Sequence, residues 1–256
     1  MNMQKTHHIL WTGGFDSTFR VLDLVLNKKR QVQPHYIIDE ERPSTNKELE
    51  TIHTIIAHIG IMDMKAAERI KPLIIVNKKD ITSDQEDKDK FERLISTSFL
   101  GTQYVWLPAY LKQNGITEIE SGAHKDDNIE TFIADYVEKI EDNDDYYYML
   151  KDEYADTDLS IFSRFQFPLL DYSKLDMERI AKESGFNHLM EMTWFCYRPQ
   201  KDGKPCGLCN PCKYAKEEGM ERRVPRPRVD DFIMFYSLKY LRKAKRNLVN
   251  GSGSKK

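Results

Sequence analysis

The 256-residue chain has little net charge and no long hydrophobic run. No stretch of about eighteen apolar residues occurs, which argues against a membrane-spanning helix. Residues 1–8 are polar and lack the apolar core of a signal peptide. A formal net charge of −2 provides no general attraction to nucleic acid or a membrane surface. We therefore expect a cytoplasmic protein without membrane association, whose 40% hydrophobic content is enough for a folded core.

Cysteine is also scarce, and all four cysteines fall within one short segment: Cys196, Cys206, Cys209 and Cys212. Disulfides are uncommon in the cytoplasm, so another reason for this grouping is needed. The spacing C-x9-C-x2-C-x2-C, with glycine, asparagine and proline between the cysteines, is typical of a closed tetrahedral Zn2+ site. All four ligand positions would be used, which predicts a structural metal. An iron–sulfur cluster and free buried cysteines are the alternatives.

Two common phosphate-binding patterns are missing, namely the Walker A sequence and the G-x-G-x-x-G fingerprint. Instead, the segment 12–18 reads Thr-Gly-Gly-Phe-Asp-Ser-Thr and lies between an apolar run and residues with helical periodicity. Two glycines allow the backbone to approach a ligand closely, and the N–H groups of a helix start bind anions. Asp16 would repel phosphate unless a cation lay between them, so it suggests Mg2+. The alternative is a plain Gly-Gly turn capped by Asp or Ser.

This segment resembles the PP-loop, Ser-Gly-Gly-x-Asp-Ser, of ATP pyrophosphatases, with Thr12 in place of the first serine. The resemblance implies that the loop binds ATP, with Asp16 and Ser17 as catalytic residues. The expected nucleotide-binding residues are Leu10, Trp11, Thr12, Gly13, Gly14, Phe15, Asp16, Ser17, Thr18, Phe19, Arg20, Asp39 and Gly122.

Strand and helix patterns alternate along the chain. Strands are predicted at 32–39, 72–77 (buried) and 115–122. One helix begins near Thr45, with Ser44 or Thr45 as its cap and with the Thr45–Glu48 spacing of a capping box. Helical patterns also cover 91–113, with breaks at Gly101 and Pro108, and a segment that includes Leu175 and ends near Gly185. The acidic or charged stretches 78–90 and 138–145 are predicted to be solvated loops. The alternation predicts an α/β fold, a parallel sheet with helices on both faces, in which Asp39, Asn77 and Gly122 converge at the carboxyl ends of strands.

Longer segments resemble the 7-cyano-7-deazaguanine synthase (QueC) family. The matching positions are Asp39 with Glu48–Glu50, Pro168–Leu170 with Lys174, Thr193–Tyr197, and the cysteine-rich 207–213. Membership implies a Rossmann-like sheet of the adenine nucleotide α-hydrolase type, a small zinc knuckle, and Lys174 facing the phosphates of ATP. It also implies adenylation of the carboxylate of 7-carboxy-7-deazaguanine, displacement of AMP by ammonia to give an amide, and a second adenylation that yields the nitrile.

The expected organisation is a nucleotide-binding domain at 1–190, a zinc-binding region at 191–220, a basic extension with a C-terminal helix at 221–248, and a flexible tail at 249–256. A homodimer is expected. Two departures from the family concern the substrate. The Tyr-Pro-Asp-Cys-Arg-like stretch near its base pocket is missing at 126–132, and the basic extension is additional.

Some QueC-like proteins are encoded in antiphage defence operons, so an alternative is an enzyme that attaches a deazaguanine to a protein or nucleic acid. A non-catalytic nucleotide-binding scaffold is the contrasting class.

Overall fold

The computed structural model describes residues 5–125, 127–227, 232–233 and 235–237. The chain divides into two compact units, 1–194 and 195–256. Most of the basic extension predicted at 221–248 and the whole tail at 249–256 lie outside the described residues. Within the described residues, no helix has the length and hydropathy needed to cross a bilayer.

The first unit is built on a five-stranded parallel sheet with the strand order β3-β2-β1-β4-β7. The order places β1 in the centre, between β2 and β4, so the chain reverses its direction of sheet growth there. A crevice for ligands forms at the carboxyl ends of strands at such a switch point. The strands are β1 Thr6–Leu10, β2 Gln31–Ile38, β3 Ile74–Asn77, β4 Ile119–Glu120 and β7 Phe165–Gln166.

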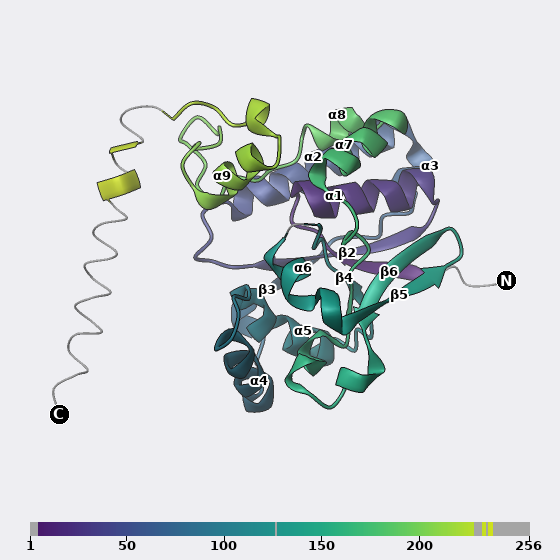
Figure 1. The fold of residues 1–256 in the computed structure, drawn as a ribbon. Coiled ribbons are helices and arrows are strands. Elements are labelled where there is room, and N and C mark those ends of the chain that lie inside the picture. Colours follow the sequence, from purple (N-terminus) through teal and green to yellow (C-terminus); the bar gives the residue numbers. More distant parts are fainter. Residues whose placement is uncertain (1–4, 126, 228–231, 234, 238–256) are drawn as a thin grey trace. The chain divides into compact units, whose positions relative to one another are not determined.

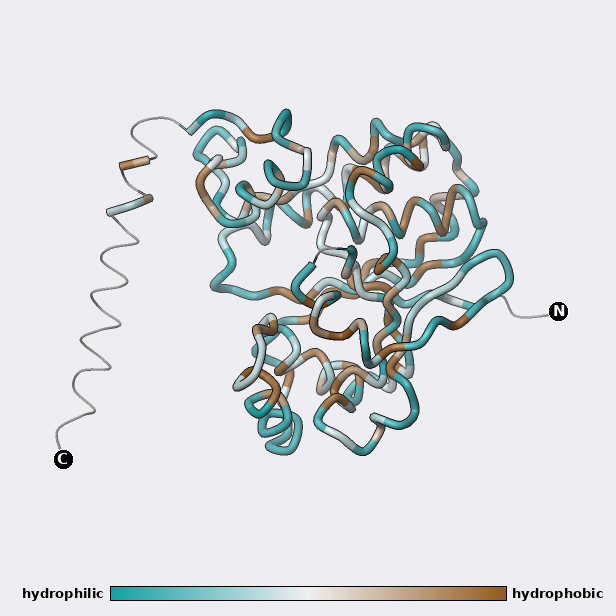
Figure 2. Tube along the Cα trace, viewed as in Figure 1, coloured by the Kyte–Doolittle hydropathy of each residue, from teal (hydrophilic) through white to brown (hydrophobic). Residues whose placement is uncertain are grey.

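Helices cover both faces of this sheet, which confirms the predicted α/β architecture. Figure 1 shows α1, α2, α7 and α8 on one side and α4 and α5 on the other. Hydrophobic residues recur along the central strands, whereas the connecting loops are more polar (Figure 2). The helices are α1 Phe15–Leu22, α2 Thr45–Met62, α3 Met64–Glu68, α4 Gln85–Ile95, α5 Leu107–Gln113, α6 Asn128–Ile133, α7 Lys174–Glu183, α8 Asn187–Met190 and, in the second unit, α9 Asn210–Glu217.

The stretch 138–145 is a β-hairpin, so its prediction as a solvated loop was wrong. Strand β5 (Val137–Asp142) pairs antiparallel with β6 (Asp145–Leu150), and Tyr148 joins the hairpin to Phe167 beyond β7. Asn143, at a φ of 59°, makes the tight turn. The acidic side chains suggested solvation, but in a strand they can alternate with residues that face the protein.

Two further predictions need correction. The segment 78–90 contains a short 3-10 turn, η2 (Lys78–Asp80), and the start of α4, which Asp84 caps by accepting a hydrogen bond from the backbone N–H of Asp87. Strand β3 exists, but it is an edge strand in which Ile74 and Ile75 are 39% and 44% exposed, rather than a buried one. In both cases, tertiary position overrode the local composition.

Candidate functional site

The loop between β1 and α1 forms the tight turn that its glycines predicted. Gly13 has a φ of +71°, and a Cβ built there would lie 3.0 Å from the backbone oxygen of Glu48 in α2. Only glycine adopts this conformation at low cost and also leaves room for α2. The loop is held further by the backbone N–H of Trp194, which donates to the Gly13 oxygen at 2.8 Å. The first turn of α1 is thereby fixed at the end of β1.

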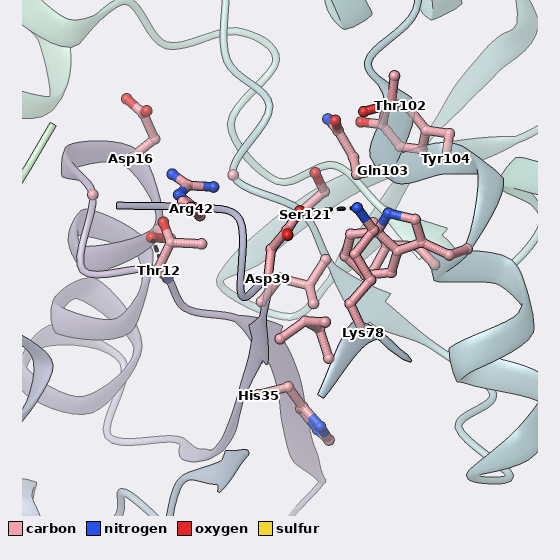
Figure 3. Close-up of a pocket in the computed structure, with 17 residues that line it drawn as sticks. Thr12, Asp16, His35, Asp39, Arg42, Lys78, Thr102, Gln103, Tyr104 and Ser121 are labelled. Carbon is pink, nitrogen blue, oxygen red and sulfur yellow. Dashed lines mark hydrogen bonds and ion pairs between the residues drawn. The ribbon is translucent and has the colours of Figure 1, made fainter. Parts of the chain in front are cut away.

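A cavity of about 360 Å3 opens at this end of the sheet (Figure 3). It is bounded by the loop after β1, by the ends of β2 and β4, and by the segment that enters α5. Seven residues predicted to bind nucleotide or catalyse the reaction line it: Leu10, Thr12, Gly14, Asp16, Ser17, Asp39 and Gly122. Of the three strand ends expected to converge here, those at Asp39 and Gly122 line the cavity, whereas the segment after β3 contributes Lys78 in place of Asn77.

Other side chains predicted to contact nucleotide lie in the core and do not line this cavity. Trp11, Phe15, Thr18 and Phe19 are all at most 5% exposed, and the indole N–H of Trp11 donates to the Thr18 hydroxyl at 2.9 Å. These buried side chains pack in the core and stabilise the loop. The resemblance assigned the whole motif to the nucleotide, but successive residues of a helix are about 100° apart, so only some of them face the cavity.

Arg20 was predicted to bind nucleotide, but it belongs to a buried ionic cluster. Its guanidinium donates to Glu120 at 2.6 Å and 3.0 Å and to Asp145 at 2.7 Å. His7 Nδ1 lies 2.7 Å from the same Glu120 carboxylate. Burial alone would raise the pKa of Glu120, but Arg20 and His7 lower it to about 2. The cluster joins α1 to β4 and β6 and positions the loop helix from its far end.

Asp16 has the features expected of a magnesium ligand. Its Oδ1 is buried and has no hydrogen-bond partner among the described residues, while its Oδ2 lies 3.8 Å from Nζ of Lys174. Burial raises the pKa of Asp127. The charge interaction with His124 opposes this rise, and the charge interaction with Asp16 adds to it. An orphaned carboxylate oxygen beside a phosphate-binding loop fits a hard divalent cation. Lys174, the first residue of α7, lies beside Asp16 through its contact with Oδ2, and its role at the phosphates stays a prediction.

Two ion pairs shape the opposite wall, and sequence reasoning missed both of their cations. Lys78 donates to Asp39 at 2.8 Å, and this hydrogen bond lowers the pKa of Asp39. Arg42 binds Glu48 through Nε and a terminal nitrogen, at 2.9 Å and 2.8 Å. Lys78 was assigned to a solvated connector, and Arg42 offered no signal except its position three residues after Asp39.

Glu48 also corrects a local prediction. The expected Thr45–Glu48 capping box is wrong, because Ser44 is the N-cap residue and makes no side-chain cap hydrogen bond. Glu48 is only 4% exposed and accepts hydrogen bonds from Tyr36 at 2.8 Å and Ser44 at 2.7 Å, in addition to Arg42. Its carboxylate is therefore a buried anchor for the segment that follows β2.

His35 forms part of the cavity lining without adding charge. Burial, together with the neighbouring His8, lowers the pKa of His35 to about 4. Its Nδ1 lies 2.6 Å from the Tyr110 hydroxyl and its Nε2 lies 2.9 Å from His8. The formal charges of the lining residues Asp16, Asp39, Arg42 and Lys78 therefore cancel.

A second cavity of about 290 Å3 adjoins the first and shares Gln103, Tyr104, Ser121 and Gly122 with it. Its remaining lining includes Phe99 and Asp127. A Cβ at Gly122 would lie 3.2 Å from the backbone nitrogen of Ser17, so this glycine allows the loop after β4 to approach the first turn of α1. Two adjoining cavities suit a reaction between two substrates.

The four cysteines of the second unit form a compact buried cluster. Their sulfur atoms all lie within 4.8 Å of one another, with separations of 3.8, 3.9 and 3.4 Å between three of the pairs. Four thiolates at Zn–S distances of about 2.3 Å would have S···S separations of about 3.8 Å in a tetrahedron. The backbone N–H of Cys206 also donates to Cys196 Sγ at 3.1 Å. The donor set could therefore hold a zinc ion.

Comparison with known families agrees with this geometry. The family described as "Queuosine biosynthesis protein QueC" matches residues 7–223. The chain belongs to the QueC family. This membership, which the loop and the cysteine spacing predicted, covers both the nucleotide cavity and the cysteine cluster.

Among the relatives of this QueC family chain, the protein of Vesicomyosocius okutanii named 7-cyano-7-deazaguanine synthase is 24% identical over 230 residues, which are 85% of this chain and 92% of that protein. The synthase of Nitrosococcus oceani is 33% identical over 64 residues, or 25% of this chain and 28% of that one. A solved 4-thiouridine synthetase–RNA complex with bound ATP covers 86% of this chain and 50% of its own, with 14% identity and a TM-score of 0.38, which is too low to identify a fold.

Proposed function

We propose that this QueC family protein uses ATP to convert 7-carboxy-7-deazaguanine into 7-cyano-7-deazaguanine. The observation that carries the proposal is the Gly-Gly-x-Asp-Ser loop at the sheet's switch point, where it borders a cavity that shares a wall with a second one. The QueC relatives named 7-cyano-7-deazaguanine synthase support the choice of substrate.

ATP would occupy the cavity beside the loop, and the deazapurine acid would occupy the adjoining cavity. The backbone N–H groups at the start of α1 and the Ser17 hydroxyl would bind phosphate oxygens. Asp16, together with Asp127 of the adjoining cavity, would hold magnesium, which supplies charge neutralisation at the phosphates when it is bound. Lys174 would neutralise further negative charge from the first turn of α7.

The reaction would proceed in two adenylation stages. In the first, a substrate carboxylate oxygen attacks the α-phosphorus of ATP and pyrophosphate leaves. Ammonia then attacks the carbonyl carbon, AMP leaves, and a proton is released to give the amide. In the second stage, the amide oxygen attacks the α-phosphorus of a second ATP and pyrophosphate leaves; loss of AMP and two protons then leaves the carbon–nitrogen triple bond. The protein contributes mainly positioning and charge stabilisation.

The direct test is pyrophosphate release with ATP, Mg2+, 7-carboxy-7-deazaguanine and ammonium, with products identified by mass spectrometry. We expect two pyrophosphates per nitrile. In D16N and S17A, turnover should fall by at least about a hundredfold while the folded state persists, because each removes a contact to the phosphates or their cation. Near-normal turnover in both variants would contradict these roles.

The products also separate the proposed function from its alternatives. An amide that does not proceed, or an adenylate that persists, would indicate that a protein or nucleic acid is the true acceptor. Absence of AMP and pyrophosphate with this acid, combined with tight ATP binding, would point to another acid. Absence of ATP binding would indicate a scaffold.

A further inference from the structure

The segment after β2 brings an arginine into the nucleotide cavity. We propose that Arg42 binds the phosphate chain of the nucleotide as a second cation in addition to Lys174. The inference rests on the part of the proposed function that places ATP in this cavity. Figure 3 shows Arg42 in the same part of the cavity as Thr12 and Asp16 of the loop.

The guanidinium is oriented by a carboxylate that cannot move easily. Nε and one terminal nitrogen of Arg42 contact Oε1 of Glu48, which is 4% exposed and also accepts from Ser44 and Tyr36. A guanidinium has five N–H donors in one plane, so one edge can bind a carboxylate while another binds a phosphate. Glu48 therefore sets the plane of the group before any nucleotide arrives.

Glu48 also packs against Gly13 of the loop between β1 and α1. The backbone oxygen of Glu48 lies so near Gly13 that a Cβ there would be 3.0 Å away, and Thr51 and Ile52 of the same helix also contact that position. The start of α2 therefore packs directly against the loop. Through Glu48, this packing sets the position of Arg42 relative to the loop.

Exposure and charge distinguish this role from a purely structural one. The Arg42 side chain is 42% exposed, whereas Arg20, which serves only the buried ionic cluster, is 3% exposed. In the described part of the chain, two cationic side chains line the cavity, Arg42 and Lys78. Lys78, which follows β3, is paired with Asp39, which follows β2. Because the lining charges cancel, the binding of a triphosphate needs favourable contacts with individual cations such as Arg42.

The test is a comparison of two ligands in the full-length protein. Binding of α,β-methylene-ATP with Mg2+ and of adenosine is measured by calorimetry for the wild type and R42Q. A charge-assisted phosphate contact predicts a rise of about tenfold to a hundredfold in the Kd of the ATP analogue, with adenosine binding unchanged. R42K should recover part of the loss, because lysine restores the charge without the planar fork.

The matched control is R93Q, which removes another arginine that pairs with a carboxylate, Asp158, and is 58% exposed but outside the cavity. It should bind both ligands normally. A second variant, E48Q, keeps Arg42 but weakens its anchor, so the analogue should bind more weakly than to the wild type and more tightly than to R42Q. Circular dichroism and thermal midpoints establish that each variant is folded.

Unchanged analogue affinity in R42Q, or equal weakening of adenosine, would overturn the inference. These measurements require no acceptor. Normal analogue binding with no conversion of 7-carboxy-7-deazaguanine would therefore refute the proposed function alone, whereas failure of the wild-type protein to bind the analogue would overturn both.

Discussion

Gly122 offers a sharp test of how closely the two ligand-binding loops approach. In G122A, the new Cβ would lie 3.2 Å from the Ser17 nitrogen and 3.5 Å from Asp16 Cβ, where ordinary van der Waals contact begins at 3.4 Å. The Ser17 nitrogen must therefore retreat by about 0.2–0.4 Å, a small overpacking strain that costs about 1 kcal/mol of stability. The shifted residues include both predicted catalytic positions of the loop.

The activity loss follows from this displacement. A misplacement of about 1 Å can reduce a rate by about a hundredfold, so a shift of about 0.2–0.4 Å scales to a loss of about 2.5-fold to sixfold. We expect this loss in kcat for pyrophosphate release at saturating ATP, measured by a coupled phosphate assay. A weakening of α,β-methylene-ATP binding should accompany it, because the same backbone N–H groups bind the ground state.

Gly60 is the matched control, because it lies inside α2 and a Cβ there would meet only Ala67 Cβ, at 3.7 Å. Alanine favours the helix interior, so G60A should be stabilised by about 0.5–1 kcal/mol with unchanged turnover. Wild-type turnover and ATP affinity in a folded G122A would refute the close approach. A G122A protein that does not fold would refute the estimate of strain.

The other predictions concern the buried cluster and the metal. E120Q leaves Arg20 without its full partner and should lower the free energy of unfolding by about 3–5 kcal/mol in urea. Because the folded pKa of Glu120 is depressed to about 2, its contribution, about 3 kcal/mol by linkage, is complete above about pH 5 and is lost as the pH falls toward 2. A pH-independent difference between wild type and E120Q would contradict this. The purified protein should contain about one zinc per chain, and C206S should lose it and become sensitive to trypsin at Lys201 and Lys204; a wild type without metal would rule out the zinc site.

The elements that sequence alone predicted are those in which neighbouring residues carry the signal. The Gly-Gly-x-Asp-Ser loop and the cysteine spacing are local patterns, and the strand–helix alternation is a repeated one. The structure accordingly contains the parallel sheet, the loop at its switch point and the four clustered sulfur atoms.

The features that sequence missed depend on residues that are distant along the chain. Asp145 was read as part of a solvated acidic loop, yet it is 8% exposed because Arg20, 125 residues earlier, pairs with it. Lys78 and Arg42 were not selected because only the folded sheet brings them to one cavity with the loop. A charged residue in a sequence therefore does not reveal its role, because its partner in the folded structure decides whether it is solvated, structural or functional.

The wall shared by the two cavities bears on the fate of a reactive intermediate. Ser121 and Gly122 line both cavities, so an acyl adenylate formed from ATP in one and the acid in the other would lie across their shared wall. An attacking amine could then reach it without release of the intermediate. Water and amine then compete for one electrophile, and the yield becomes a branching ratio between hydrolysis and amide formation. Selectivity in such a site depends as much on which nucleophile arrives first as on how tightly either substrate is held.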